Sequence, residues 1–331
     1  MRVFVTHNPE DRAAYFGRAL PQLEAIADVV TNPLERDLTT DELVDAAAGC
    51  HVIIAHRATP GEAELFARSP DLIAFLRCAV DISTIDVASA SDHGVLVARA
   101  DKSFVASTAE LALGLLIDTV RNISESTTDY RLGHEPPQRS GRQLRGQTAG
   151  IIGYGAIGSY LADLLISLGL HVLVHDPYVE SMPGTVEQVA LPHLLARADA
   201  IFPLAPGGPA TTHLIGAGEL AAMKPGAVLI NVSRGEVLDE DAVAAALDSG
   251  HLGGLGVDVG LAADQRPSPT LAARPGVVAT PHLGGLTPEN ADAQAASAVE
   301  QVAAMKSGVT PPRAVNLDHA TRLEQFWADE L

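Results

Sequence analysis

The sequence is poor in cysteine, in aromatic residues and in positive charge, and each shortage excludes a class of protein. Two cysteines in 331 residues are too few for a disulfide framework, and they lack the spacing of metal ligands. Aromatic residues make up only 4% of the chain, so we expect a core of Ala, Val, Leu and Ile. With 29 glycines, this composition favours layered α/β architecture over an aromatic-rich sandwich.

The deficit of positive charge narrows the choice of partners. The chain has 22 basic and 41 acidic residues, which gives a net charge of −19. No basic stripe is available to neutralise phosphates, so we expect neither nucleic acid nor an anionic membrane as a partner. The same field repels anionic substrates at long range, so local groups must hold any anion that binds.

Long hydrophobic runs are also missing. The most apolar helical stretch, residues 109–120, contains Glu110 and Asp118, so no membrane span is expected. The chain opens on an apolar alternation without a signal-peptide pattern, and with so few cysteines this predicts a cytoplasmic protein. No metal site is predicted, because His171 and His175 have the spacing of a metal pair but lie on an expected strand.

A strand–helix alternation is present, and it is interrupted once. Strands are expected at residues 2–6, 28–30, 52–55, 73–78 and 95–98, and again at 148–152, 170–175, 200–204, 227–232, 254–259 and 277–280. This rhythm predicts parallel sheets. A long helical pattern fills residues 103–132 and is apolar over much of its circumference, so it needs a second surface to pack on.

The length of the chain suits two domains of about 150 residues each. The last long helix, near residues 288–306, runs back past the second set of strands. We therefore expect one lobe from residues 1–100 with 291–331, and a second lobe, residues 101–290, inserted into it.

A glycine-rich segment follows the expected strand at 148–152 and opens a helix. It reads Gly153-Tyr154-Gly155-Ala156-Ile157-Gly158, a spacing typical of dinucleotide-binding turns, where the glycines allow a tight turn, close approach of the pyrophosphate and close packing of helix on strand. The next strand ends in Asp176-Pro177, about where an acid meets the ribose hydroxyls, which favours NAD over NADP. The alternative is a glycine-rich turn without a cofactor, but the strand, the helix and the acid are all in place.

Four blocks, the first of which includes this glycine-rich segment, occur in a fixed order between residues 144 and 285. They are residues 144–158, residues 203–206 with 211–215, the segment MKPGAVLINVSRG at 223–235, and TPHLGG at 280–285. On these blocks the chain resembles the D-isomer-specific 2-hydroxyacid dehydrogenase family over most of residues 101–290. The likeness is looser over residues 77–86 and 105–110.

The resemblance implies a fold, an activity and a partner. The fold is α/β, with two doubly wound parallel-sheet lobes, a Rossmann NAD-binding lobe being inserted into a smaller flavodoxin-like substrate lobe. The activity is NAD-dependent interconversion of a 2-hydroxy acid and its 2-keto acid by hydride transfer. The partner is usually a second copy of the chain in a homodimer, and the helix after residue 102 corresponds to the element that family members use to dimerise.

The strand ends and the resemblance together supply the candidate site residues. Arg234 follows a strand end, where ligands of open sheets bind, and its planar guanidinium suits a carboxylate and a carbonyl. His282 follows another strand end, and an imidazole exchanges protons near neutral pH. Cofactor contacts are expected from Gly153, Gly155, Ala156, Ile157, Gly158, Asp176, Pro177, Leu204, Ala205, Pro206, Thr212, Val232, Ser233, Arg234, Asp258, His282 and Gly284. Substrate contacts are expected from Arg57, Ala79, Val80 and Asp81.

Two departures from the family pattern bear on the chemistry. The family carries a glutamate that hydrogen-bonds the histidine, and Ala263 occupies that position here, so Asp264 is the candidate replacement if the loop shifts by one residue. The glycine loop that takes the substrate carboxylate has Ala79 and Asp81 in place of its glycines. A carboxylate at Asp81 that faced the cleft would repel an anion, so we expect a substrate with a cationic, hydroxylated or bulky group near it.

Two other functions remain open at this stage. The same scaffold is consistent with oxidation of another small donor, such as formate or phosphite. A non-catalytic NAD-sensing protein is the alternative outside enzymes, favoured by the missing glutamate and disfavoured by the presence of both Arg234 and His282. Taken alone, Arg234 could also be an ordinary surface ion-pair residue.

Overall fold

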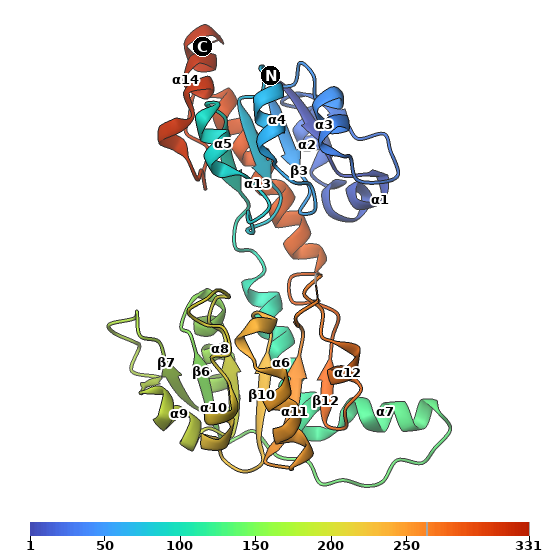
Figure 1. Cartoon of the computed structure of the whole chain (residues 1–331), viewed down its shortest axis with the longest axis vertical. Helices are drawn as coiled ribbons and strands as arrows, with labels where there is room; N and C mark the ends of the chain where they lie inside the picture. The colour runs from blue at the N-terminus through green and yellow to red at the C-terminus, as the bar shows by residue number, and fades with distance from the viewer. Residues whose placement is uncertain (263, 331) are drawn as a thin grey trace. The chain divides into compact units, whose positions relative to one another are not determined.

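The computed structural model describes residues 1–262 and 264–330, which form two compact units. Unit 1 consists of residues 1–103 together with the segment that starts at Pro288, and unit 2 is Phe104–Thr287. The chain passes between the units at points three residues from those expected at 100/101 and 290/291. Both units are α/β structures with parallel sheets (Figure 1).

Unit 1 contains a five-stranded parallel sheet in the order β2-β1-β3-β4-β5. The strands are β1 (Arg2–Val5), β2 (Asp28–Thr31), β3 (Val52–Ala55), β4 (Ala74–Arg77) and β5 (Leu96–Arg99). Both β3 and β4 are buried along their whole length, which explains why their sequences are apolar runs without alternation. The order 2-1-3-4-5 is that of flavodoxin-like folds, with a switch point between β1 and β3.

Helices cover both faces of the unit 1 sheet. One face packs against η1 (Arg12–Phe16), α2 (Leu20–Glu24), α13 (Pro288–Lys306) and α14 (Thr321–Glu330). The short elements α1 (Pro9–Asp11) and η3 (Leu317–His319) bury none of their residues. The other face packs against α3 (Thr40–Ala46), α4 (Ala63–Arg68) and α5 (Val87–Asp92). The returning segment from Pro288 onward therefore completes the core of unit 1 rather than forming a separate tail.

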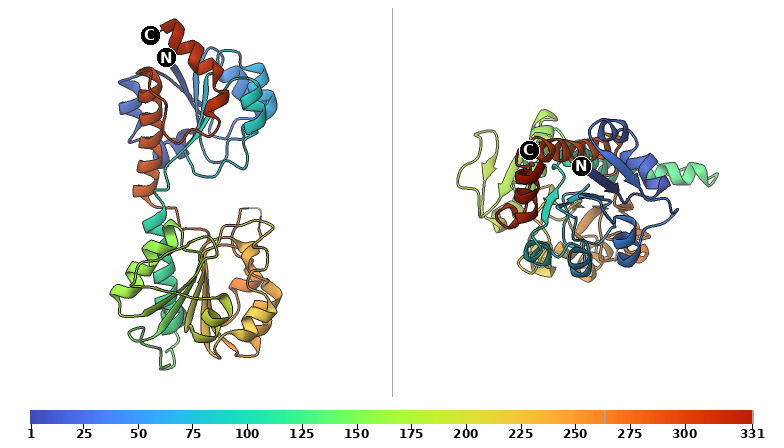
Figure 2. Two further views of the ribbon diagram at one scale, coloured as in Figure 1. Left: turned by 90° about the vertical axis from the view of Figure 1, so that its left-hand side faces the viewer. Right: turned by 90° about the horizontal axis from the view of Figure 1, so that it is seen from above.

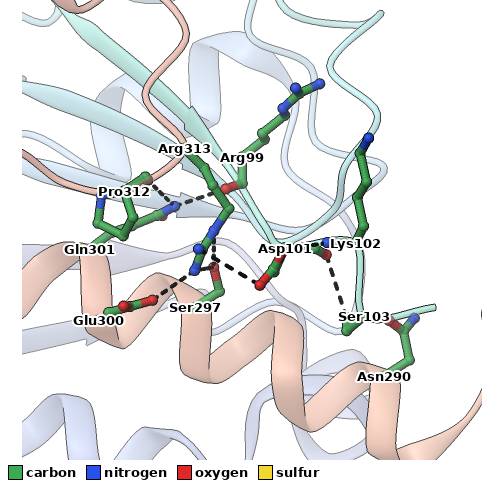
Figure 3. Close-up of polar contacts among 10 residues, drawn as sticks. All are labelled: Arg99, Asp101, Lys102, Ser103, Asn290, Ser297, Glu300, Gln301, Pro312 and Arg313. Carbon is green, nitrogen blue, oxygen red and sulfur yellow. Dashed lines mark hydrogen bonds and ion pairs between the residues drawn. The ribbon is translucent and has the colours of Figure 1, made fainter. Parts of the chain in front are cut away.

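Polar contacts around Arg313 fasten the end of the chain to the rest of unit 1 (Figure 3). Arg313 has a φ of 63°, which is uncommon for a residue other than glycine. Its guanidinium contacts Ser297, Glu300 and Asp101. Gln301 is 1% exposed, and its Nε2 donates to the carbonyl oxygens of Arg99 and Pro312, at 2.8 and 3.0 Å. The segment after β5, where the chain leaves unit 1, is thus held to α13.

Unit 2 contains a seven-stranded parallel sheet in the order β12-β11-β10-β9-β6-β7-β8. The strands are β6 (Thr148–Ile152), β7 (His171–His175), β8 (Glu187–Gln188), β9 (Ala200–Pro203), β10 (Ala227–Asn231), β11 (Leu252–Val257) and β12 (Val277–Ala279). Six of them were expected from the sequence, whereas β8 is too short to leave a periodic signal. The order reverses at β6, which is the Rossmann arrangement with its switch point between β6 and β9.

Two layers of helices cover the unit 2 sheet (Figure 2). On one face lie α6 (Val105–Arg121) and α8 (Ala156–Ser167). On the other lie α9 (Leu191–Arg197), α10 (Ala217–Ala222), α11 (Glu240–Asp248) and α12 (Pro269–Ala272). None of the described helices of the chain combines the length and apolarity that a bilayer crossing needs.

The long helix expected over residues 103–132 is divided in the structure, so that prediction was wrong in its continuity. Asn122 adopts a left-handed conformation with φ 55°, which asparagine tolerates better than most residues. It ends α6 and begins α7 (Ile123–Arg131). In contrast to α6, α7 buries none of its residues, and it projects from the body of unit 2 (Figure 1).

Candidate functional site

The predicted site residues of unit 2 gather at one edge of its sheet. All of its strands are parallel, so their carboxyl ends meet at the same edge. Gly153 follows β6 and Asp176 follows β7. Arg234 and His282 lie beyond the ends of β10 and β12, which are the two neighbours of β11. Ligands of open α/β sheets bind at this edge.

The glycine turn has the geometry that its sequence predicts. Gly153 has a φ of 100°, a region open to glycine. At Gly158 an added Cβ would lie 2.2 Å from the carbonyl oxygen of Gly153, so only glycine allows α8 to start so close to β6. At Gly155, the residue that caps α8, an added Cβ meets nothing within 4 Å. The space beside Gly155 at the helix N-terminus is therefore open, as the approach of a pyrophosphate requires.

The carboxylate of Asp176 is fixed by main-chain hydrogen bonds. Its Oδ2 accepts from the N–H of Tyr154 at 2.7 Å, and its Oδ1 accepts from the N–H of Tyr178 at 2.9 Å. The acid is therefore tied directly to the glycine turn and to the residue after Pro177. Each carboxylate oxygen can accept more than one hydrogen bond, so the group retains capacity for hydroxyl donors.

The remaining predicted cofactor contacts come from two further strand ends and the start of α8. Leu204 follows β9, and its N–H donates to the carbonyl of Ile152 at 2.7 Å, which ties this strand end to that of β6. Thr212 is exposed and donates from Oγ1 to the carbonyl of Gly208. The others lie at the same edge: Ala156 and Ile157 at the start of α8, Ala205 and Pro206 after β9, and Val232 and Ser233 after β10.

A buried asparagine that the sequence did not single out holds Arg234 in place. Asn231 ends β10 and is 0% exposed. Its Nδ2 donates to the carbonyl oxygen of Arg234 at 2.9 Å, and its Oδ1 accepts from the N–H of Ser233 at 3.0 Å. The guanidinium of Arg234 is half-buried and donates to the carbonyl of Ser233. Because a buried amide needs several partners, Asn231 fixes the turn that carries Arg234.

The loop that carries His282 is fixed by Asp258. This residue is 1% exposed and follows β11. Its Oδ1 accepts from the Thr280 hydroxyl at 2.7 Å and from the N–H of Leu283 at 2.6 Å, and its Oδ2 accepts from the N–H of Gly284 at 2.8 Å. The carboxylate of Asp258 thus hydrogen-bonds to the chain on both sides of His282 and fixes the position of that residue.

Helix α6 also supports this loop. Ser107 donates from Oγ to the carbonyl oxygen of Gly284 at 2.8 Å. An added Cβ at Gly284 would lie 3.1 Å from Asp258 Oδ2 and 3.2 Å from the hydroxyl oxygen of Thr108. Sequence reasoning missed Ser107 and Thr108, because a serine and a threonine near a helix start normally indicate a cap.

His282 meets a carbonyl oxygen where a carboxylate was expected. The residue has a φ of 62°, and its Nδ1 lies 3.5 Å from the main-chain oxygen of Asp264. The carboxylate of Asp264 accepts from the N–H of Arg266 at 3.2 Å and lies 3.1 Å from its Nε. The main chain of Asp264, and not its side chain, is therefore what the structure places beside the imidazole. Ala263, at the family's glutamate position, lies outside the described residues.

The predicted substrate residues of unit 1 follow β3 and β4. Arg57 is exposed, just beyond β3. Ala79 and Val80 are partly buried after β4, and Ala79 accepts the N–H of Ala100 on its carbonyl oxygen. Asp81 is exposed, and its Oδ1 accepts the N–H of Ser83 at 2.8 Å. That contact closes a local turn in the loop.

Arg77 connects the two loops. It ends β4 and is 1% exposed. Its guanidinium donates to the carbonyl oxygens of His56 and Arg57 and to the hydroxyl of Thr84. Burial lowers the pKa of Arg77 to about 10, so it remains a cation at neutral pH. Its charge is used to shape the loop that presents Arg57.

Comparison with known proteins places this geometry in a family. Residues 113–284 match the family model described as D-isomer specific 2-hydroxyacid dehydrogenase, NAD binding domain. A D-3-phosphoglycerate dehydrogenase of Mycobacterium leprae is 36% identical over 87% of this chain and 56% of its own length. An (S)-sulfolactate dehydrogenase of Chromohalobacter salexigens is 36% identical over 75% of this chain and 82% of its own length.

A solved structure has the same fold over nearly the whole chain. The TT0316 protein of Thermus thermophilus is 30% identical and superposes with a TM-score of 0.82, covering 95% of this chain and 100% of that one. The chain spans little more than half the length of the phosphoglycerate dehydrogenases that it matches. It contains an NAD-binding domain, and it belongs to the D-isomer specific 2-hydroxyacid dehydrogenase family.

Proposed function

We propose that this chain is an NAD-dependent oxidoreductase that interconverts a 2-hydroxy acid and its 2-keto acid. The observation that carries this proposal is the placement of Arg234 and His282 beyond the ends of β10 and β12, on either side of β11. The glycine turn after β6 lies at the same edge. One edge of one sheet therefore offers a cation, a proton donor and a cofactor cradle.

The residues of unit 2 fit NAD. Gly153, Gly155 and Gly158 would let the pyrophosphate approach the start of α8, and Asp176 would accept hydrogen bonds from the ribose hydroxyls. When bound, the nicotinamide supplies or accepts the hydride. Unit 2 is accordingly the proposed NAD-binding lobe, and unit 1, with Arg57 and the segment Ala79–Asp81, is the proposed substrate lobe.

Arg234 and His282 divide the work at the reacting carbon. The guanidinium of Arg234 pairs with the substrate carboxylate and polarises the keto oxygen. Its planar group of N–H donors can make both contacts at the same time. In reduction, the protonated imidazole of His282 gives a proton to the oxygen that becomes the hydroxyl, and in oxidation the neutral ring takes it back. Because Asn231 and Asp258 fix the two turns, the groups are held before substrate arrives.

The proposed proton donor works beside the carbonyl of Asp264. A carbonyl oxygen accepts a hydrogen bond from Nδ1–H and so selects the orientation of the ring. It lacks the full negative charge of a carboxylate, so it favours the imidazolium less than the family's glutamate would. Asp264 therefore contributes through its main chain, while its side chain pairs with Arg266.

The substrate is proposed to differ from simple small keto acids. Asp81 places a negative charge in the segment that otherwise meets the substrate carboxylate, and the chain as a whole is acidic. Two relatives are named for phosphoglycerate and sulfolactate, whose distal groups are anions. Here a cationic, hydroxylated or bulky distal group near Asp81 is favoured instead.

We further propose that the protein is a homodimer and that it is located in the cytoplasm. Helix α7 buries none of its residues within this chain, and its Ile123 and Tyr130, together with Leu132 just after it, are exposed. A second copy is the proposed surface that covers them. Cys50 and Cys78 are unpaired and buried, as expected for a reducing compartment.

The activity is tested by following NADH oxidation with a panel of 2-keto acids that have small, bulky, acidic and basic side chains. NADH binding is measured on the same sample. We expect turnover with at least one member, and a shift of preference toward glyoxylate and pyruvate in Asp81→Gly. Tight NADH binding without turnover on any member contradicts the dehydrogenase and favours a sensor or an enzyme for another donor. If wild type and Asp81→Gly have the same substrate preference, the proposed role of Asp81 is contradicted, whereas the dehydrogenase activity is not.

The cofactor choice gives a second prediction. Asp176→Asn removes the negative charge but keeps an oxygen that can accept the N–H of Tyr154. Because the charge repels a 2′-phosphate, we expect the ratio of kcat/KM with NADPH to that with NADH to rise tenfold or more, about 1.4 kcal/mol. Steady-state kinetics with both cofactors measure the ratio. An unchanged ratio in a folded variant would mean that Asp176 does not face the ribose.

A further inference from the structure

A group of polar side chains at the carboxyl edge of the unit 1 sheet is not used by the proposed reaction. Asp11 ends α1, Asp37 lies in the loop between β2 and α3, and His56 follows β3. One carboxylate oxygen of each aspartate and one ring nitrogen of the histidine all lie within 4.8 Å of one another. We call these three residues the Asp–Asp–His cluster. It lies at the switch point of the sheet, where open α/β folds bind ligands.

The main chain around the cluster is fixed without help from a ligand. The N–H of His56 donates to Thr6 Oγ1 at 2.9 Å, and the same hydroxyl group is hydrogen-bonded to Thr59 at 2.7 Å. The carbonyl oxygen of His56 accepts from the buried guanidinium of Arg77 at 2.7 Å. Asp11 Oδ2 accepts from Asn8 Nδ2 at 2.7 Å. The main chain of His56 and the carboxylate of Asp11 are thus already fixed, which lowers the cost of binding an ion.

Buried nitrogens without partners point to a ligand here. His56 Nδ1 is buried and makes no hydrogen bond, and it lies 3.8 Å from Asp11 Oδ2. The ring of His7, 1% exposed, has its centroid 5.0 Å from that of His56, and its Nδ1 also has no partner. Buried polar atoms in native proteins are normally paired. The cluster thus contains a buried ring nitrogen, that of His56, that is available to a bound species.

The charges around the cluster favour a cation over an anion as the bound species. A neutral imidazole is the form that binds a metal. Asp11 and Asp37 add two negative charges, which Arg57 and Arg77 oppose near His56. An anion would meet two carboxylates in this cluster, whereas a cation is attracted by them.

We propose that Asp11, Asp37 and His56 bind one divalent transition-metal ion of the Zn²⁺ class. One imidazole nitrogen with carboxylate oxygens suits this class, whereas Ca²⁺ and Mg²⁺ prefer oxygen ligands alone. The ion ties together the segments that follow β1, β2 and β3 and so stiffens the edge of the unit 1 sheet. This site does not depend on hydride transfer, so it stands or fails separately from the proposed activity.

The test uses the full chain, free of any affinity tag and stripped with a chelator. Calorimetric titration with Zn²⁺ is expected to give one saturable site per chain. Asp37→Asn and His56→Gln are each expected to weaken binding at least about tenfold. The matched control is the double variant Asp318→Asn/His319→Gln, which removes an exposed aspartate and histidine of the same unit and should bind as wild type does. Titration with Co²⁺ gives a visible spectrum that should change in His56→Gln.

Thermal unfolding supplies a second readout. Zn²⁺ is expected to raise the Tm of wild type and of the control variant, because binding to the native state stabilises it, and to raise that of Asp37→Asn much less. Asp37 is exposed, so its replacement should leave the fold intact. Absence of saturable binding overturns the proposal, and so does equal Zn²⁺ affinity in Asp37→Asn, His56→Gln and the control.

Discussion

Replacing His282 with asparagine is expected to lower kcat for reduction of the preferred 2-keto acid by about 10²–10⁴-fold, the usual contribution of a positioned acid or base. Asparagine is the appropriate replacement because position 282 has a φ of 62°, and asparagine tolerates that region better than glutamine or alanine. NADH affinity should change little, since the glycine turn is untouched. The measurement is steady-state kinetics beside direct NADH titration.

Asp264→Asn is the matched comparison. It removes the carboxylate that pairs with Arg266 but keeps the carbonyl oxygen 3.5 Å from His282 Nδ1. We expect kcat to stay within about threefold of wild type, because a side chain that acts elsewhere contributes little to the proton step. A loss as large as that of His282→Asn would show that the carboxylate takes part in the reaction.

Ala263→Glu adds the acid that the family resemblance places at that position. A carboxylate favours the imidazolium, so the protonated donor should persist to higher pH. The alkaline limb of the kcat/KM profile for reduction is therefore expected to move to higher pH in this variant. If His282→Asn keeps the wild-type rate and the wild-type pH profile, His282 is not the proton donor.

The sequence predicted the parts of the fold that repeat a simple pattern. Buried parallel strands such as β3 and β10 are apolar runs bounded by polar residues, so their positions were expected to within a residue or two. Gly169 and Gly250, which follow α8 and α11, have φ of 83° and 72°, the left-handed conformation that glycine commonly adopts after a helix. Short elements such as α1 and β8 have too few residues to show a period.

Single residues in unusual conformations were harder to predict. Asn122 divides the expected long helix because its φ is positive, a choice that helical periodicity does not record. The orientation of the Asp264 side chain is set by Arg266, two residues away, and no spacing rule shows which atom of Asp264 faces His282. In such cases the conformation of the residue depends on small free-energy differences between competing local hydrogen bonds.

Residues that act through others were also missed for a physical reason. Asn231 was not singled out, and Asp258 was expected as a cofactor contact and not as the group that fixes the His282 loop. Both residues are buried and bond mainly to main-chain atoms, and main-chain partners leave no trace in the sequence. The Asp–Asp–His cluster comes from three segments that are separate in the sequence, those after β1, β2 and β3, so its members have no common spacing. Only the parallel arrangement of β1, β2 and β3 brings them to one edge.

Replacing Arg234 with glutamine is expected to lower kcat/KM by about 10³-fold, or about 4 kcal/mol, because the substrate loses both its carboxylate partner and the charge that polarises the keto oxygen. Loss of the first contact raises KM, and loss of the second lowers kcat, so both constants should change. NADH binding should again be nearly unchanged. Steady-state kinetics over a wide range of keto-acid concentrations separate the two effects.

Two further variants distinguish charge from geometry at this position. Arg234→Lys keeps the charge but lacks the planar fork, so it should recover only part of the lost rate. Arg274→Gln is the matched control. Arg274 pairs with Asp248 near the amino ends of β11 and β12, at the edge of the sheet opposite the proposed site. The kinetics of this variant should equal those of wild type. If Arg234→Gln raises KM while kcat is unchanged, Arg234 binds the carboxylate but does not polarise the carbonyl. If neither constant changes, Arg234 does not meet the substrate, and the cation of this site must come from another residue.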